Sequence, residues 1–243
     1  MEEIRAEHLC FSYDGARDVL RDLNFCIGQE EAVGLIGANG AGKSTLLKIL
    51  VGLVSGYRGR VEVGGLHVEK KHLQRIRRQT GYVFQDSESQ LFLSTVYEDV
   101  AFGPRNYGYD EAEVDRLVME ALRQVHMEDM KDRQIYRMSG GQKKLAAIAT
   151  VLSMEPRMIL LDEPSGGLDP RNRRNLIQVI RTMRGARIVA SHDLDLILDT
   201  CRRTILIGEG RIVKDGPTEE ILTDEKLLWE HGLELPLSLL GRQ

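Results

Sequence analysis

A glycine-rich stretch in the first quarter of the chain constrains its fold more than any other feature. Residues 37–45 read Gly-Ala-Asn-Gly-Ala-Gly-Lys-Ser-Thr, which fits the phosphate-binding pattern G-x-x-x-x-G-K-S/T. An apolar run at 32–36 predicts a buried strand before it, and apolar residues at helical spacing from Leu46 to Leu50 predict a helix after it. The glycines therefore occupy a strand-to-helix turn, where a backbone without side chains can close around a phosphate.

The chemistry of this loop predicts a site for a nucleoside triphosphate and Mg²⁺. Its backbone N–H groups and the N-terminus of the following helix present partial positive charge to a phosphate. Lys43 is expected to reach the β- and γ-phosphates, and the Ser44 hydroxyl to ligate Mg²⁺. The residues predicted to hold the nucleotide here are Gly37, Ala38, Asn39, Gly40, Ala41, Gly42, Lys43, Ser44 and Thr45. The loop by itself does not indicate which reaction follows.

A second stretch places two acids at the end of an apolar strand. Residues 158–161 form a continuous apolar run, which is typical of a parallel strand buried on both faces, and Asp162 and Glu163 follow directly. Buried carboxylates need partners, so these two acids are expected to face a site. Asp162 is suited to hold Mg²⁺, directly or through water, and Glu163 to polarise an attacking water.

Three further short stretches carry polar residues where a ligand site is expected. Gln85 and His192 each follow a predicted strand, and the carboxyl ends of strands are where ligands bind in α/β proteins. Residues 139–142 read Ser-Gly-Gly-Gln and begin a predicted helix. Such a start offers an anion site for the same electrostatic reason as the phosphate-binding loop.

Composition excludes several classes of function. The chain has 243 residues, enough for one large domain or two small ones, and its net charge is −4. That charge gives no electrostatic case for non-specific nucleic-acid binding, so no nucleic acid is expected as a partner, although a local basic patch at Arg75, Arg77 and Arg78 stays open. Cys10, Cys26 and Cys201 fit neither a metal spacing nor a disulfide framework. No N-terminal signal sequence and no apolar run near 18 residues is present, so any membrane role is expected to pass through a partner.

The alternation of strands and helices predicts an α/β fold with a parallel sheet. Two strands around a turn in residues 2–27 add an antiparallel β-subdomain at the N-terminus. Helices expected at 95–107, at 110–125 and from Ser139 onward lie between two strands of the main sheet, which indicates an inserted helical subdomain. The predicted divisions are a domain at 1–215, its helical subdomain at about 90–155, and a short helical tail at 216–243.

The tail has its own start and stop signals. Thr218 is expected to cap one short helix, and residues 223–224 to open another that closes at 231–232. Leucines recur from Leu233 to Leu240, so this end is expected to pack on a surface. That surface is either part of its own domain or part of a second chain, and the sequence allows both.

The order of these motifs resembles that of the ABC-transporter ATPase family. The resemblance covers the chain from Tyr13 to about Gly216 and implies ATP as the nucleotide. It implies that Tyr13 stacks on adenine, that residues 37–45 are Walker A, and that Gln85 touches Mg²⁺ and the attacking water and senses a membrane partner.

Two positions depart from the family pattern. Met138 replaces the usual Leu, and little effect is expected from that change. Leu145 replaces a common Arg, which puts a surface charge contact in doubt.

The same resemblance assigns the remaining site residues. Ser139, Gly140, Gly141 and Gln142 look like the signature motif, which binds the γ-phosphate of an ATP held by the opposite chain. Asp162 and Glu163 look like the Walker B pair, with Glu163 as general base. Asp169 looks like the D-loop acid at the dimer seam, and His192 like the switch histidine on the γ-phosphate. Two ATPase chains, identical or closely related, are therefore expected to form two sites.

A finer resemblance lies in residues 84–92 and 95–106, which look like the ATPase of energy-coupling-factor importers for cobalt, nickel and vitamins. It implies a membrane-embedded coupling subunit, a substrate-binding membrane subunit, and a peripheral position at the cytoplasmic face of the membrane. The alternative is a soluble ABC ATPase acting on DNA or translation, although the long insertions or basic tracts of such proteins are not visible here. A binding module without catalysis is disfavoured by intact Glu163 and His192.

Overall fold

The structure, a computed structural model that describes residues 2–240, contains two β-sheets. The smaller sheet is antiparallel and has the strand order β2-β1-β4-β5. Its strands are β1 (Glu2–Phe11), β2 (Leu20–Gly28), β4 (Arg58–Val63) and β5 (Leu66–His67). Buried and exposed residues alternate along β2, as expected for a sheet with one face on the core.

The larger sheet is parallel except at one edge and has the order β10-β9-β3-β8-β7-β6. Its strands are β3 (Ala32–Ile36), β6 (Thr80–Val83), β7 (Met158–Asp162), β8 (Ala186–Ala190), β9 (Arg203–Gly208) and β10 (Arg211–Pro217). Every residue of β3 and of β7 is buried, as their continuous apolar runs predict. The α/β fold with an antiparallel subdomain is thereby confirmed.

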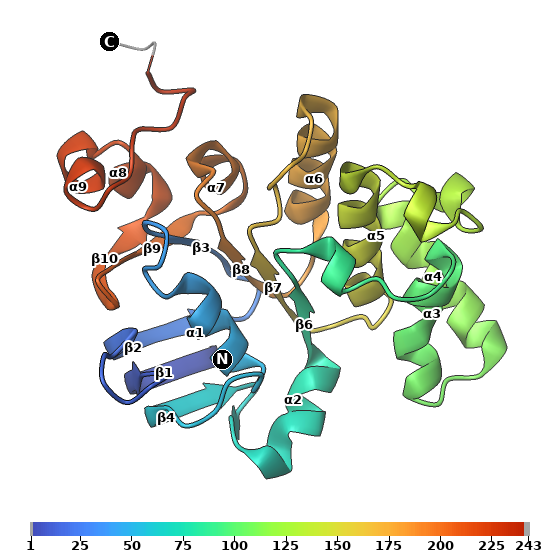
Figure 1. Cartoon of the computed structure of the whole chain (residues 1–243), viewed down its shortest axis with the longest axis horizontal. Helices are drawn as coiled ribbons and strands as arrows, with labels where there is room; N and C mark the ends of the chain where they lie inside the picture. Colours follow the sequence, from blue (N-terminus) through green and yellow to red (C-terminus); the bar gives the residue numbers. More distant parts are fainter. Residues whose placement is uncertain (1, 241–243) are drawn as a thin grey trace.

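Helix α1 (Lys43–Leu50) lies between the two sheets (Figure 1). Its leucines share one hydrophobic core with Leu9 of the smaller sheet and Leu35 of the larger one. The opposite face of the larger sheet packs against α5 (Gly140–Leu152), α6 (Pro170–Thr182) and α7 (Leu194–Thr200) around a second core. The main sheet is thus covered on both faces, which is the usual condition for parallel strands.

The helical subdomain stands to one side of the main sheet (Figure 1). It contains α3 (Val96–Asn106) and α4 (Glu111–Gln124), which agree with the predicted helices to within a residue or so. Thr95 and Glu98 form a capping box at the start of α3, and Asp110 caps α4. The smaller α2 (Leu73–Gln79) leads into β6, and short 3₁₀ turns occupy 70–72, 87–89, 128–130 and 135–137.

The tail forms α8 (Thr218–Leu222) and α9 (Glu225–Glu230). Asp224 caps α9 as predicted, but the prediction that Thr218 caps α8 is wrong. Thr218 is buried against the main sheet, where its hydroxyl pairs with Thr204 Oγ1 at 2.8 Å, so the hydroxyl satisfies a core contact instead of the helix end. Leu233 is buried on its own domain, whereas Leu237 is 77% exposed.

None of the helices in the described part of the chain combines the length and the hydrophobicity that a membrane span needs.

Candidate nucleotide site

The glycine-rich loop joins β3 to α1, as predicted, and two of its glycines are required by close contacts. Gly37 has φ of 151°, and a Cβ atom there would lie 2.3 Å from the carbonyl oxygen of Ile207. Gly42 has φ of 107°, and a Cβ atom there would lie 2.6 Å from Leu20. A Cβ at position 37 would clash with the backbone of Ile207, and the positive φ at position 42 strains any larger residue, so the narrow turn depends on glycine.

Lys43 is held at the centre of this loop. Its Nζ donates hydrogen bonds to the carbonyl oxygens of Gly37 at 2.7 Å and Ala38 at 3.4 Å, and lies 3.9 Å from Glu163 Oε1. Burial lowers the pKa of Lys43, while the carboxylates of Glu163 and Asp162 oppose that shift. The Lys43 ammonium is therefore held within the loop, where it can donate charge-assisted hydrogen bonds to phosphate oxygens.

Asp162 ends β7 and is 1% exposed. Ser44 Oγ donates to its Oδ1 at 2.9 Å, so two of the three residues predicted for Mg²⁺ lie together. Tyr82 donates its hydroxyl to the other oxygen, Oδ2, at 2.9 Å. No sequence pattern indicated Tyr82, because its contact with Asp162 depends on β6 lying beside β7.

Glu163 and His192 meet at the carboxyl ends of β7 and β8. His192 Nδ1 lies 2.8 Å from Glu163 Oε2, which also accepts from the His192 backbone N–H and from the Ser191 hydroxyl, both at 3.2 Å. Glu163 has φ of 46°, a conformation that costs a non-glycine residue about 1–3 kcal/mol. Its backbone N–H compensates by donating to the Ala190 carbonyl at 2.8 Å.

An ion pair that the sequence did not reveal supports the loop carrying His192. Arg173 on α6 donates from Nε and from one terminal nitrogen to the two oxygens of Asp193, at 2.7 and 2.8 Å. Burial would raise the pKa of Asp193, but the Arg173 hydrogen bonds and the Leu196 N–H hold it below its usual value. Asp193 also caps α7 through Leu196, so it joins two helices behind His192.

Tyr13 lies at the mouth of the loop. Its ring is 63% exposed, its hydroxyl is 3.1 Å from Thr45 Oγ1, and Phe11 contacts it edge-on at 4.8 Å. With Gly40 and Arg17 it lines a hollow of about 410 Å³. An exposed aromatic face beside the phosphate-binding loop can stack on a base.

The remaining predicted residues lie elsewhere in the single chain. Ser139 and Gln142 form a capping box at the start of α5, and Asp169 caps α6 through the N–H groups of Arg171 and Asn172. Figure 1 shows α5 beside the helical subdomain, well separated from α1. Residues 139–142 therefore do not complete the site around Lys43 within one chain.

Gln85 follows β6 as predicted, and its side chain is exposed. Its carbonyl oxygen accepts from Lys144 Nζ at 2.6 Å, and burial lowers the pKa of Lys144.

The two residues that depart from the family pattern, Met138 and Leu145, are buried in the core that includes the helical subdomain. Leu145 faces that core, so it makes no surface contact.

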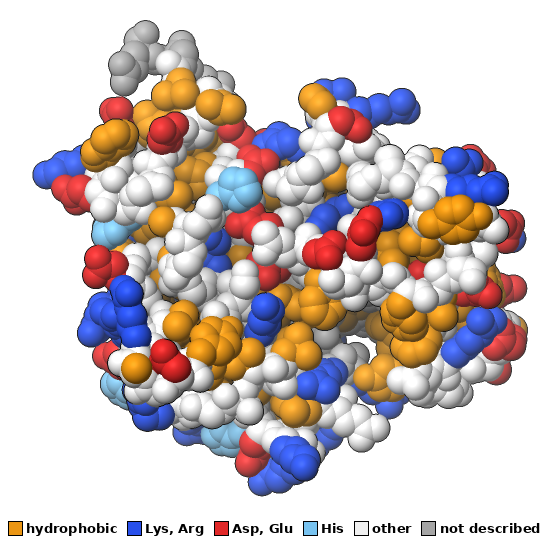
Figure 2. Space-filling view, in the orientation of Figure 1, with side chains coloured by type: hydrophobic (Ala, Val, Ile, Leu, Met, Phe, Trp, Pro, Cys, Tyr) orange, Lys and Arg blue, Asp and Glu red, His pale blue; other side chains and the backbone are white. Residues whose placement is uncertain are grey.

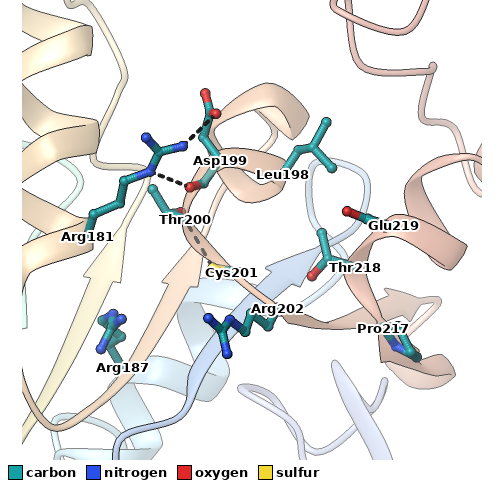
Figure 3. Close-up of a pocket in the computed structure, with 10 residues that line it drawn as sticks. All are labelled: Arg181, Arg187, Leu198, Asp199, Thr200, Cys201, Arg202, Pro217, Thr218 and Glu219. Atoms are coloured by element: carbon teal, nitrogen blue, oxygen red, sulfur yellow. Dashed lines mark hydrogen bonds and ion pairs between the residues drawn. The ribbon is translucent and has the colours of Figure 1, made fainter.

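A hollow of about 600 Å³ lies at the opposite edge of the main sheet, where α7 ends (Figure 3). Arg181 donates to the Asp199 carbonyl at 2.8 Å and to its carboxylate at 3.0 Å, and Arg187 and Arg202 lie below them (Figure 3). Arginines balance the partial negative charge of a helix C-terminus. That role accounts for Arg181, which contacts Asp199 at the end of α7. None of the predicted site residues lines this hollow, and we assign no ligand to it.

Comparisons with known proteins agree with these observations. The profile of the family described as ABC transporter matches residues 20–166. A protein of Gloeobacter violaceus, provisionally named an ABC transporter ATP-binding protein, is 48% identical and spans 98% of this chain and 99% of its own. EcfA of Carboxydothermus hydrogenoformans, an energy-coupling factor transporter ATP-binding protein, is 41% identical over 96% of this chain and 87% of its own.

A solved structure shares both the fold and the sequence. That structure is cbiO1 from Clostridium perfringens, described as part of the ABC transporter complex cbiONQ. It superposes with a TM-score of 0.84, is 32% identical, and covers 94% of each chain. With the motif order and the two-sheet fold, these matches confirm the predicted family and its activity, ATP hydrolysis. The chain belongs to the ABC transporter ATPase family.

Proposed function

We propose that this chain is the ATP-hydrolysing subunit of an energy-coupling-factor importer for a metal ion such as cobalt or nickel, or for a vitamin. It works as one of two ATPase chains at the cytoplasmic face of the membrane. A membrane-embedded coupling subunit and a substrate-binding subunit complete the transporter. The observation that carries this proposal is the 41% identity to EcfA over nearly the whole chain, supported by the likeness to cbiO1.

The geometry supports roles for the residues of one half-site. The loop at 37–45 binds the phosphates, with Lys43 on the β- and γ-phosphates, and Tyr13 stacks on adenine. Glu163 orients and deprotonates the attacking water, and His192, 2.8 Å from it, reaches the γ-phosphate. Residues 139–142 of the second chain, with Asp169 at the seam, close the site from the other side.

The oxygen donors around Asp162 fit Mg²⁺. Ser44 and Asp162 offer hydroxyl and carboxylate oxygens 2.9 Å apart at the end of a buried strand, and hard cations of this kind prefer oxygen ligands. Ser44 and Asp162 would hold the ion, with Gln85 as the third predicted residue. When bound, Mg²⁺ would neutralise charge on the β- and γ-phosphates.

An exposed aromatic surface that includes Phe92, in the segment that follows Gln85, offers a docking site for the coupling subunit. Phe92 is 63% and Tyr136 71% exposed, and both line a hollow of about 500 Å³; Phe102, 46% exposed, packs edge-on against Phe92. Figure 2 shows hydrophobic side chains gathered over the helical subdomain. Grouped exposed aromatics beside a polar rim are typical of protein interaction sites. ATP-driven closure of the two chains would thus move the coupling subunit.

Purification from native membranes tests this proposal. The tagged chain is expected to bring down a polytopic coupling subunit and a small substrate-binding membrane protein, identified by mass spectrometry. Phe92→Asp is expected to lose both companions, because a charge in the aromatic surface cannot be desolvated there. The matched control is Trp229→Asp, which alters an aromatic that is 75% exposed on α9. Recovery only from the soluble fraction, or with nucleic acid, would overturn the importer assignment.

A further inference from the structure

Tyr82 makes a hydrogen bond that the family roles of the site residues leave unexplained. It lies on β6, and its hydroxyl donates to Asp162 Oδ2 at 2.9 Å. The two residues are 80 positions apart in the chain, so only the pairing of β6 with β7 brings them together. Nothing else in the described site donates to this oxygen.

The contact fixes the orientation of the Asp162 carboxylate. One oxygen, Oδ1, accepts from Ser44 and the other from Tyr82, both at 2.9 Å. Because Asp162 is 1% exposed, loss of either donor would leave a buried carboxylate oxygen without its partner, and rotation of the carboxylate would break both bonds. The hydroxyl groups of Ser44 and Tyr82 therefore restrict rotation of the Asp162 carboxylate from both sides.

Tyr82 is itself held in place. Its register partner on β7 is Leu160, its ring packs with the core between the sheets, and Phe84 contacts it edge-on at 4.8 Å. Burial and the neighbouring carboxylate of Asp162 raise the pKa of Tyr82 above its usual value. The strand pairing and the Phe84 contact therefore hold the Tyr82 ring beside Asp162.

We propose that Tyr82 is a positioning residue that aims the Asp162 carboxylate at Mg²⁺, and so sets the affinity of the site for the ion. This inference rests on the metal-binding role proposed above for Asp162. Hydrogen bonds to a metal-binding carboxylate typically account for about 10- to 100-fold in metal affinity or activity. The Tyr82 hydroxyl reaches the site through its hydrogen bond to Asp162 Oδ2, so Tyr82 is proposed to act through Asp162.

The test compares Tyr82→Phe with a matched tyrosine elsewhere in the chain. Tyr57 is also half-buried and donates its hydroxyl at 2.7 Å, but to the backbone carbonyl of Val68, away from the site. The affinity of each variant for a fluorescent ATP analogue is measured in EDTA and then across a Mg²⁺ titration. Thermal unfolding in EDTA without nucleotide checks that each variant folds.

The expected result is a shift in the metal titration alone. Tyr82→Phe should raise the half-saturating Mg²⁺ concentration about tenfold or more, with nucleotide affinity in EDTA unchanged. Tyr57→Phe should match the natural protein in both measurements. The contrary result is a Tyr82→Phe variant that lowers the unfolding temperature no differently from Tyr57→Phe and leaves the Mg²⁺ titration unchanged. That result would show a purely structural role for Tyr82 and would overturn the proposal.

A third variant separates this inference from the role of Asp162. Asp162→Asn removes the carboxylate charge and is expected to abolish the Mg²⁺ dependence of nucleotide binding. If Asp162→Asn shifts the titration and Tyr82→Phe does not, the role of Asp162 stands and that of Tyr82 fails. If Asp162→Asn binds nucleotide with unchanged Mg²⁺ dependence, the proposed metal site itself is wrong.

Discussion

At the scale of single residues, Glu163 combines strain with a dense set of contacts. Its positive φ of 46° turns the side chain away from the path of β7 and toward the edge where Lys43 and His192 lie. Backbone strain of this kind persists only where surrounding contacts over-determine it. Here the Ala190 carbonyl, the Ser191 hydroxyl and the His192 ring hold it. The strained backbone at Glu163 thus lowers the stability of the fold while it positions the Glu163 carboxylate.

Glu163→Gln is expected to reduce ATP turnover about 100- to 10,000-fold, because an amide cannot accept a proton from the attacking water. ATP binding should persist, since Lys43 keeps its contacts with the loop, and the ATP-bound pair of chains should accumulate. Phosphate release and nucleotide retention after gel filtration measure the two effects. Glu155→Gln is the control, because Glu155 also has φ of 46° but is exposed. Full turnover in Glu163→Gln would remove Glu163 as the base.

At the scale of elements, the segment after β6 is fastened to α5. Gln90 accepts from the Phe84 N–H at 3.0 Å and donates to the Ala147 carbonyl at 2.7 Å and the Thr150 hydroxyl at 2.8 Å. Lys144 on α5 adds its bond to the Gln85 carbonyl. The segment proposed to sense the membrane partner and α5, which Ser139 caps, are therefore expected to move as one body.

Gln90→Ala should loosen this connection and lower stability by about 1–3 kcal/mol, because it leaves the Phe84 N–H without its acceptor. For a chain of this size, each kcal/mol corresponds to a drop of about 2–4 °C in the unfolding temperature. Calorimetry measures the change. Gln178→Ala on α6 is the matched control, because Gln178 is exposed. Equal unfolding temperatures for the two variants would show that Gln90 does not fasten the segment.

At the scale of the whole molecule, one chain contains two unlike half-sites. Lys43, Asp162, Glu163 and His192 gather at one edge of the main sheet, while residues 139–142 lie at the start of α5. Isologous pairing of two copies would set each loop against the other chain's α5, as expected for a two-fold symmetric pair.

Mixing two inactive variants tests that pairing. Lys43→Ala damages the loop, and Ser139→Arg places a large cation where the opposite chain's nucleotide is expected. A mixed pair then contains one doubly damaged site and one intact site, so an equal mixture should recover about a quarter of the natural sites. ATPase assays on each variant and on the mixture measure the recovery. A mixture no more active than its parts would contradict a pair of identical chains.

The sequence alone was sufficient for the local features of this protein. The glycine loop between a strand and a helix, the acids at the end of an apolar strand and the cap at Asp224 depend on neighbours within a few residues, so their patterns could be read directly. The one wrong cap, Thr218, failed because Thr204 on β9 competes for its hydroxyl. The family resemblance added the roles predicted for Tyr13, residues 139–142 and Asp169, which no local pattern contains.

Only the tertiary structure decided which of those residues meet. Ser44 and Asp162 are 118 positions apart, and Tyr82 and Asp162 are 80 apart, yet each pair is in contact at 2.9 Å. These contacts follow from the strand order β3-β8-β7-β6, which brings the carboxyl ends of four strands to one edge. Strand order depends on long-range packing between layers, so local patterns do not contain it. Tyr82 and Gln90 therefore emerge only when the sheet and its helices are assembled.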